Sequence, residues 1–497
     1  MAVLTTPGFD LIPSAEKQLL ATNYIKDFDF LDQYLPDTYE KEFERYGNRT
    51  ISSFLRMVGA EMPSASDLIK WAEQGRLHVA YNNVNADSAV TSDTATFTVN
   101  DTLTNPGAGG IGVGGTTASG NNIGIREGQT VLISKNGSGT TLFNKAIVTT
   151  APTHPTAGAT TFTVAYYEAA GQTFAVNDTV SVFIYGSEFA KGEAGMTRSL
   201  ESDSYIFENK PIIIKDVYKV NGSDMAQIGW IEVTSENGAS GYLWYLKSEH
   251  DTRSRFEDHM ETALVEAVPA EAASGAADYL QGASAGTGEA NLSGSEGVFY
   301  AVENRGNVFG GGNPTTLADF DSVIQRLDKQ GAIEENVLFV NRQFSFDIDD
   351  MLAAQNSYGA GGTSYGLFDN DEEMALNLGF SGFRRGYDFY KTDWKYLNDP
   401  TMRGLIDNGK INGLLVPAGS TTVYDQVMGK NAKRPFLHVR YRASEMEDRR
   451  YKTFIVGSAG APSGSRVGND IDAMEVHFLT ERCVCVMGAN NFFLFKD

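Results

Sequence analysis

Residues 240–268 read SGYLWYLKSEHDTRSRFEDHMETALVEAV, and this stretch decides how the rest of the chain is organised. It contains no proline before Pro269 and no glycine after Gly241. About 27 helix-compatible residues at about 1.5 Å each predict a helix on the order of 40 Å long. The mean globular helix is less than half that length. In a chain that also contains 52 glycines, one long straight element needs an explanation.

The predicted helix has an apolar face and a charged face. The apolar positions recur at spacings of three, four, seven or ten residues: Tyr242, Tyr245, Leu246, Phe256, Met260, Ala263 and Ala267. The charged positions are Lys247, Glu249, Asp251, Arg255, Glu257, Asp258 and Glu261. The middle of the helix, KSEHDTRSR, is polar nearly all round. We therefore expect the helix to pack against a sheet or a neighbour along only part of its length.

Composition excludes several classes of protein. With 41% hydrophobic and 21% charged residues, the 497-residue chain is typical of a folded soluble protein. Its net charge of −23 argues against nucleic-acid recognition as the main task, because proteins that read DNA usually carry a basic surface. The first residues lack the pattern of a secretory signal, and no run of about 18 apolar residues predicts a membrane span.

The two cysteines lie together in ERCVCVMG, as Cys483 and Cys485. On a strand they would share one face, which is a poor geometry for an unstrained disulfide. We expect both to be buried as small apolar residues, in a protein that folds in a reducing cytoplasm.

The N-terminal part of the chain is unusually aromatic for a solvated tail. Two interpretations of residues 1–50 stay open: a segment packed along its own domain, or an arm that docks on a neighbouring subunit. The next segment, SASDLIKWAEQGRLH, predicts a short helix that begins after Ser64 or Ser66 and ends at Gly75.

Composition changes abruptly near Asn85. From there to Gly186 the chain is rich in Thr, Ala, Gly and Val, and charges are scarce. Short strand-like runs such as ATFTVND, QTVLISK and NDTVSVFIYG alternate with turn clusters. This spacing predicts a small closed barrel or sandwich, inserted between two parts of another domain.

The remaining segments mix helices and strands. A strong strand is predicted at Pro211–Val220, with VNGSD as a turn and QIGWIEV as the returning strand. Residues 270–313 are small and glycine-rich, which predicts a long loop. Residues 314–419 alternate between helix and strand patterns, as expected of an α+β or α/β domain. Strands then return up to the C-terminus.

No pattern in the sequence demands catalysis, a metal or a cofactor. The six histidines lack metal-ligand spacing, and the acidic clusters at Asp347–Asp350 and Asp369–Glu373 do not match a calcium loop. The glycine-rich GGIGVGG is not followed by the helix that a phosphate-binding loop requires. No nucleophile elbow is present. The two catalytic carboxylates of a glycosidase can come from distant parts of a sequence and leave little local motif, so a catalytic site of that kind stays open.

The order of these segments resembles the major capsid protein of tailed bacteriophages, which has the Hong Kong 97-type α+β fold. ENKPIIIKDVYKVNGSDMAQIGWIEV followed by SGYLWYLKSEHDTRSRFEDHME is most similar to capsid proteins of the crAss-like phages, as is EFAKGEAG. The resemblance implies an N-arm, an extended E-loop, a peripheral (P) domain with a long spine helix, and an axial (A) domain. The sequence departs from the family pattern in one respect, because no charged, coiled-coil-like scaffolding segment precedes the arm. We therefore expect either that scaffolding is a separate protein or that none is needed.

The resemblance divides the chain into segments with stated roles. These are an N-terminal arm (1–50), the start of the P-domain and E-loop region with a short helix (51–84), an inserted all-β barrel or sandwich (85–186), E-loop and P-domain strands (187–235), the spine helix and a following extended loop (236–313), the A-domain (314–435), and return strands of the P-domain (436–497).

The resemblance also implies a function and its partners. The chain would be a non-enzymatic subunit of an icosahedral shell, assembling with itself into hexamers and pentamers around double-stranded DNA. It would be assembled in the bacterial cytoplasm and retained in the virion. Expected partners are a portal protein and separate scaffolding and decoration proteins, with loose, non-specific contact to DNA and no contact with membrane. An acidic chain fits a container that must release its genome.

We expect the following residues to make contacts between subunits: Tyr24, Phe28, Phe30, Tyr34, Tyr39, Phe43, Lys191, Arg198, Arg253 and Arg255. Some shells of this fold carry Lys–Asn cross-links, and Lys191 lies in the matching loop. Its polar, glycine-rich surroundings offer little of the desolvation that lowers a lysine pKa, so we expect a non-covalent shell.

Two other functions remain open from the sequence. The β-rich insertion could make the protein an adhesin or glycan-binding protein, which predicts an exposed aromatic platform. The 314–419 region could form a cytoplasmic hydrolase. Electron microscopy of the purified protein distinguishes shells from both alternatives.

Overall fold

The computed structural model describes residues 60–74, 78, 80–87, 93–99, 124–135, 143–151, 161–168, 174–196, 204–225, 232–234, 240–271, 274–276, 279, 294–330, 333–355, 382–418, 420–425, 430–457 and 471–497. The chain divides into two compact units. Unit 1 includes residues 215–259 and 452–479. Unit 2 includes residues 51–214, 260–451 and 480–497.

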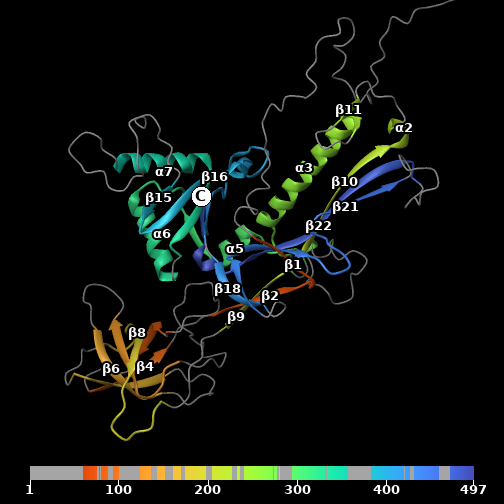
Figure 1. The fold of residues 1–497 in the computed structure, drawn as a ribbon. Helices are drawn as coiled ribbons and strands as arrows, with labels where there is room; N and C mark the ends of the chain where they lie inside the picture. The colour runs from red at the N-terminus through yellow and green to blue at the C-terminus, as the bar shows by residue number, and fades with distance from the viewer. Residues whose placement is uncertain are drawn as a thin grey trace, which may run out of the picture. The chain divides into compact units, whose positions relative to one another are not determined.

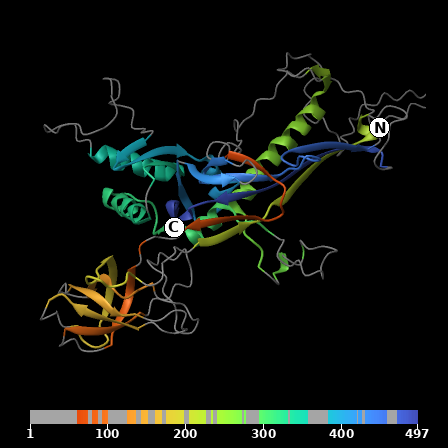
Figure 2. The ribbon, with the colours of Figure 1, turned by 60° about the horizontal axis from the view of Figure 1, so that its bottom comes forward.

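The long helix of unit 1 lies beside long antiparallel strands. Helix α3 (Leu243–Glu266) continues into unit 2, as do β10 (Ile212–Asn221) and β22 (Ala473–Val486). Strand β21 (Lys452–Gly457) pairs antiparallel with β22. The fully buried ring of Phe256 on α3 lies 5.8 Å from the ring of Phe478 on β22. Both views show α3 running alongside these strands (Figures 1 and 2).

Charged residues reinforce this part of unit 1 at its surface. Arg255 on α3 pairs with Asp216 on β10 at 3.0 Å, and Lys219 on β10 pairs with Glu475 on β22 at 3.0 Å. After β10 come the short helix α2 (Gly222–Met225) and the paired strands β11 (Glu232–Thr234) and β12 (Ser240–Tyr242).

Five strands form one mixed sheet in the order β1–β20–β22–β10, with β21 also paired to β22. Strand β1 (Ala60–Ser64) is parallel to β20 (Leu437–Arg442). Its Glu61 accepts a hydrogen bond from Arg482 at 3.1 Å and forms an ion pair with Arg450. Arg482 is buried, so this cluster fixes β1 to the sheet through groups that are costly to bury unpaired.

A second, six-stranded sheet has the order β13–β23–β17–β14–β16–β15. Its strands are β13 (Asn307–Gly310), β14 (Glu335–Val340), β15 (Gly382–Arg385), β16 (Tyr387–Asp393), β17 (Ile411–Pro417) and β23 (Phe493–Lys496). Every residue of β17 is buried, as expected for a strand covered on both faces.

Each face of the six-stranded sheet has its own core. Alternate residues of β17 point to opposite sides, so Leu414 joins one core and Leu415 the other. Helix α5 (Val298–Arg305) packs in the first core. Helices α6 (Leu317–Gln330) and α7 (Arg342–Gln355) pack in the second. The remaining short elements are α8 (Lys395–Asn398), η4 (Arg403–Leu405), η5 (Ala489–Asn491), and the hairpin of β18 (Ser420–Asp425) with β19 (Lys430–Pro435).

Six strands close into a barrel in the order β3–β4–β7–β6–β5–β8. They are β3 (Ala80–Ala86), β4 (Thr94–Val99), β5 (Gln129–Lys135), β6 (Phe143–Thr150), β7 (Thr161–Tyr166) and β8 (Thr179–Ser187). Inward residues alternate with outward ones. The core has Phe97 at its centre, 5.7 Å from the ring of Phe162 and 6.2 Å from that of Phe174.

Several expectations agree with these elements. The predicted long helix is confirmed as α3, and Cys483 and Cys485 are buried free thiols. The strand predicted at Pro211–Val220 is β10. The region predicted as a barrel or sandwich over 85–186 contains the closed barrel, whose strands extend from Ala80 to Ser187.

The helix predicted between Ser64 or Ser66 and Gly75 is wrong. Residues 69–74 form the strand β2 (Ile69–Gln74), which pairs with β9 (Ser204–Asn209). The partner strand lies more than a hundred residues away in sequence. This long-range pairing overrides the helical propensity of IKWAEQ.

Residues 227–231 of the predicted returning strand QIGWIEV lie outside the described residues, while its last two residues, Glu232 and Val233, belong to β11, which pairs with β12. The prediction of one long loop is wrong. The predicted loop at 270–313 contains α5 and β13, and β13 pairs with β23. Strand β23, expected among the return strands of the P-domain, therefore belongs to the same sheet as the strands of the 314–435 region.

One position on the long helix also differs from the prediction. Glu261, assigned to the charged face, is only 4% exposed. Leu264 and Val265 are buried beside it, so the buried face near the end of α3 is rotated from the one that Ala263 and Ala267 indicated.

Candidate functional site

The antiparallel strands β2 and β9 form a stem that connects the barrel to the rest of unit 2. Chain order requires this, because the barrel strands lie between β2 and β9. One face of the stem is exposed and carries a pair between Lys70 and Glu208 at 3.1 Å. The other face points inward and presents Trp71, Phe207 and Asn209, since residues two apart on a strand share a face.

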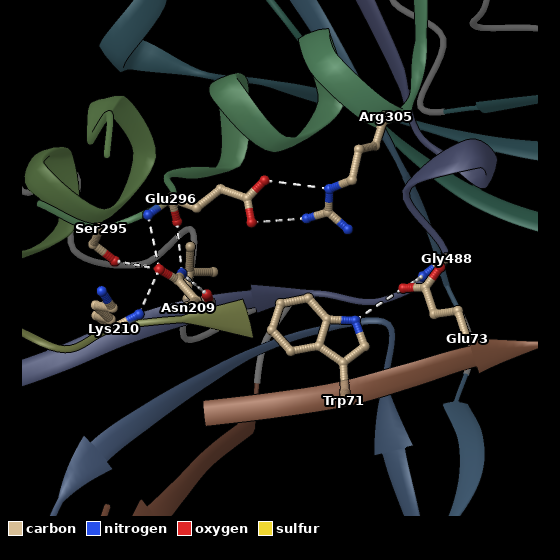
Figure 3. Close-up of polar contacts among 9 residues, drawn as sticks. Trp71, Glu73, Asn209, Lys210, Ser295, Glu296, Arg305 and Gly488 are labelled. Atoms are coloured by element: carbon tan, nitrogen blue, oxygen red, sulfur yellow. Dashed lines mark hydrogen bonds and ion pairs between the residues drawn. The ribbon is translucent and has the colours of Figure 1, made fainter. Parts of the chain in front are cut away.

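Arg305, the last residue of α5, packs against the inward face of the stem (Figure 3). Its guanidinium carbon lies 4.5 Å from the ring centre of Phe207 and 5.7 Å from that of Trp71. A cation in such contact with aromatic faces gains electrostatic stabilisation, and more when water is excluded. Arg305 thus joins a helix of the central region to both strands of the stem.

The same guanidinium forms a two-point ion pair with Glu296. Nη2 lies 2.9 Å from Oε2, and Nε donates to Oε1 at 3.2 Å. The side chains of Arg305 and Glu296 are only 12% and 15% exposed. Burial raises the pKa of Glu296 above its ordinary value, and Arg305 opposes that shift only in part. The pair is therefore one in which either partner is costly to remove.

Asn209, at the end of β9, uses both ends of its amide. Nδ2 donates to the carbonyl oxygens of Glu296, at 2.9 Å, and Val484, at 2.5 Å. Oδ1 accepts from Ser295 Oγ at 3.0 Å, and from the backbone N–H groups of Glu296 and Lys210, both at 2.8 Å. Because the side chain is buried and acts as donor and acceptor at once, neither Asp nor Leu reproduces it.

Glu73 on β2 links the stem to the C-terminal part of the chain through a hydrogen bond. Its Oε1 accepts from Trp71 Nε1 at 2.9 Å and from the backbone N–H of Gly488 at 2.9 Å. Gly488 has a left-handed backbone conformation with φ of 60°. Glycine adopts this conformation without the strain that a Cβ would introduce.

We name this cluster the stem junction. It consists of Trp71, Glu73, Phe207, Asn209, Ser295, Glu296, Arg305 and Gly488. The residues come from β2, β9, the approach to α5, α5 itself, and the turn after β22. The arrangement contains no activated nucleophile. What it can do is hold the stem in a fixed orientation through buried, directional contacts.

The predicted contact residues are not part of the stem junction. Arg253 pairs with Glu249 one helical turn away at 3.4 Å, and Arg255 pairs with Asp216, so both make ion pairs within the chain. Both side chains remain about half exposed. Lys191 is exposed in a turn after β8. Arg198 and the aromatic residues Tyr24, Phe28, Phe30, Tyr34, Tyr39 and Phe43 lie outside the described residues.

The sequence analysis did not identify the stem junction. Trp71 and Glu73 lay in the segment interpreted as a helix, while Glu296 and Arg305 lay in the segment interpreted as a loop. One signal could have located α5: the apolar residues Val298, Phe299, Ala301 and Val302 follow helical spacing within GVFYAVENRG.

In the described part of the chain, no group of three or more His, Cys, Asp or Glu side chains is placed to hold a metal ion. None of the described helices combines the length and apolarity needed to cross a bilayer.

No protein-family model and no curated protein matches the sequence. Solved structures do match. A structure from Microbacterium phage Oxtober96 has a TM-score of 0.38 and 9% identity, covering 95% of this chain and 98% of that one. The capsid of a native GTA particle has a TM-score of 0.38 and 9% identity, covering 96% and 99%. The holo-SrpI encapsulin complex of Synechococcus elongatus PCC 7942 has a TM-score of 0.32 and 12% identity, covering 59% and 77%. The grouping with crAss-like phages stays a prediction.

Proposed function

We propose that this protein is the structural subunit of an icosahedral virus shell that assembles into hexamers and pentamers around double-stranded DNA. The observation that carries the proposal is one combination of elements in a single chain. A 24-residue helix lies beside long antiparallel strands, and a separate two-stranded stem is anchored by a buried polar junction.

The long helix suits a mechanical function. The helix packs against β22 through Phe256, and its exposed Arg255 pairs with Asp216 on the neighbouring strand β10. A helix supported by a sheet resists bending across tens of ångströms, which a thin shell subunit requires.

The stem junction suits an element that must transmit force. In a shell, a stem that overlaps a neighbouring subunit would transmit force to the point where it joins its own subunit. Weak surface pairs such as Lys70–Glu208 are worth about 0–1 kcal/mol each and would not secure this point. A buried, bidentate ion pair with aromatic contacts is a stronger attachment.

The proposal includes a division of labour among segments. Residues 1–50 and the stem would contact neighbouring subunits, and the barrel would face outward as a separable domain. Lys191 would make ionic contacts only, because it is exposed and none of the described contacts places a buried carboxylate beside it. A portal protein, scaffolding proteins and decoration proteins would complete the particle, and the acidic surface would keep DNA contacts weak.

The test is assembly of the purified full-length chain, followed by sedimentation and negative-stain electron microscopy. Capsomers or closed shells are expected, alone or with co-expressed portal and scaffolding proteins. A protein that stays monomeric at every concentration, with those partners present, contradicts the proposal.

Two variants separate assembly from folding. Removing residues 1–45 should leave folded subunits that fail to close, because the arm would be an intersubunit contact. Replacing residues 80–187, which include all six barrel strands, by a short linker should leave a core that still assembles. Particles of normal size from the first variant, or complete insolubility of the second, would contradict the assigned roles. Boiled particles should run as a single band of monomer on a denaturing gel.

A further inference from the structure

Exposed aromatic side chains gather on one outer face of the barrel. Phe143, Tyr167, Phe183 and Tyr185 are each between 45% and 53% exposed. Two of them, Tyr167 and Tyr185, line a hollow of about 490 Å³ together with Lys145 and Glu188. A volume of this size lies within the usual range for small-ligand sites.

Strand pairing places these residues outside the barrel. Strand β5 lies between β6 and β8, and its Leu132 is in register with Lys145 on one side and Phe183 on the other. The neighbouring residues Val131, Ile133 and Val182 are buried in the barrel core. The aromatic face is therefore not a core that has been left open, since the core is complete without it.

The two tyrosine rings at the hollow are held by polar contacts. Tyr167 donates its hydroxyl proton to Glu188 Oε2 at 2.6 Å, and the backbone N–H of Glu188 donates to the carbonyl of Gly128 at 2.9 Å. The ammonium of Lys145 lies 5.9 Å from the ring centre of Tyr185. Burial and the bond to Glu188 raise the pKa of Tyr167 to about 12, so its hydroxyl stays a donor.

One residue that lines the hollow, Thr130, has a hydroxyl group without a hydrogen-bond partner among the described residues. Thr130 is only 4% exposed, and the unpaired oxygen is its Oγ1. A Cβ built on Gly186 would lie 3.2 Å from that oxygen, so Gly186 leaves space directly above it. Buried hydroxyl groups normally form hydrogen bonds. The Thr130 hydroxyl could therefore bind an ordered water molecule or a hydroxyl group of a ligand in the hollow.

We propose that this hollow is a binding site for a neutral carbohydrate. Tyrosine faces suit the C–H faces of a sugar ring, while Glu168, Glu188 and Lys145 offer acceptors and donors for its hydroxyl groups. The lining has two carboxylates and one ammonium, and the whole chain carries a charge of −23. Phosphate-rich ligands such as nucleic acids and anionic lipids would be repelled.

A peptide strand is a poorer occupant. Proteins often capture extended peptides at the unpaired edge of a sheet, but this barrel is closed and offers no such edge. The inference goes beyond the proposed shell function and does not depend on it, because the hollow lies within the barrel alone.

The test uses the full-length protein, biotinylated and tetramerised on labelled streptavidin, so that weak single-site binding is detected whether or not shells form. The probes are an array of neutral mucin-type, plant and bacterial oligosaccharides, with sialylated and sulfated versions beside them. We expect binding to at least one neutral probe. Tyr185→Ala and Tyr167→Ala should each weaken it about three- to tenfold, the effect of losing one aromatic contact.

Matched controls keep the result interpretable. Tyr390→Ala removes an equally exposed tyrosine, 52% exposed, from β16 of the six-stranded sheet and should leave binding unchanged. Tyr167→Phe keeps the ring but loses the bond to Glu188, and should weaken binding less than Tyr167→Ala. Thermal unfolding should match the wild type for all variants.

Three results would overturn the proposal: no neutral probe bound, binding confined to charged probes, or binding unchanged in both alanine variants. Blocking of the tyrosines by a decoration protein in purified particles, without any glycan binding, would assign the face to a protein partner instead. Particle formation, scored separately by electron microscopy, reports on the shell function.

Discussion

The barrel lies between the two stem strands in the sequence, yet the barrel and the stem junction are stabilised in opposite ways. The barrel core is built from one continuous segment and is almost wholly apolar, with Phe97, Phe162 and Phe174 at its centre. The stem junction combines short pieces that are hundreds of residues apart, and its central contacts are ionic or polar.

This difference predicts which kinds of substitution destabilise each region. Apolar burial is non-directional and contributes roughly in proportion to area, so a barrel tolerates conservative changes in its core. A buried ion pair stabilises only while both partners are present, because the remaining charge is left without solvent. The junction should therefore be destabilised when a single charged partner is lost, whereas the barrel should lose stability in proportion to the apolar volume that is removed.

Arg305→Ala should give the largest effect. It leaves Glu296 buried without its partner and removes the contacts with Trp71 and Phe207. We expect a loss of about 3–5 kcal/mol in the free energy of unfolding, measured by denaturant titration. Hydrogen exchange should show faster exchange in β2 and β9 while the barrel strands stay protected. Equal loss of protection in both regions would show that they do not differ as proposed.

Phe97→Ala should give a comparable effect of about 3–5 kcal/mol, but confined to the barrel. The ring is fully buried between Phe162 and Phe174, so truncation leaves a cavity. Exchange should quicken in β4 and β7 and stay slow in β17. The matched control is Phe143→Ala, which truncates a 53% exposed ring on the same barrel and should cost about 0.5 kcal/mol or less. If Phe97→Ala also exposes β17, the barrel is not an independent unit.

The stem junction should also show a pH dependence of known sign. Burial raises the pKa of Glu296 above 4.5, so the folded protein binds this proton more tightly than the unfolded chain does. The stability contributed by the group is complete below pH 4.5 and is lost as the pH rises through the folded pKa. We expect the free energy of unfolding of the wild type to fall, relative to that of Glu296→Gln, as the pH rises from 4.5 through the folded pKa of Glu296. The slope should be at most about 1.4 kcal/mol per pH unit.

Glu475 provides a control of opposite sign for this measurement. Lys219 and then His477 hold the pKa of its carboxyl below the ordinary value. Its contribution is therefore present above the ordinary glutamate pKa and is lost as the pH falls through the folded pKa. If Glu296→Gln and Glu475→Gln change the pH profile in the same direction, the electrostatic interpretation of the junction is wrong.

Arg253→Ala should give the smallest effect. Its pair with Glu249 spans one turn of α3 at 3.4 Å, and its side chain is 49% exposed. Such helix pairs contribute about 0.3–0.5 kcal/mol, so unfolding should change little. The comparison with Arg305→Ala uses the same substitution in exposed and buried settings. A clear assembly defect in Arg253→Ala, without loss of stability, would support the predicted intersubunit role of this residue.

The sequence by itself determined the elements whose signals are local. The absence of glycine and proline over residues 242–268 specified α3, since helix continuity depends only on neighbouring residues. Alternation specified the inward and outward faces of the barrel strands. The apolar spacing of Cys483 and Cys485 on β22 predicted their burial.

Only the tertiary structure decided which distant segments meet. Local propensity favoured a helix at Trp71, yet pairing with β9 made the segment a strand; the glycine-rich context of Glu296 and Arg305 concealed α5. The environment of Glu296 depends on Arg305, Phe207 and Asn209, and no pattern in one segment encodes those neighbours. Burial and pairing of charge are properties of the assembled chain, which is why the stem junction became visible only in the fold.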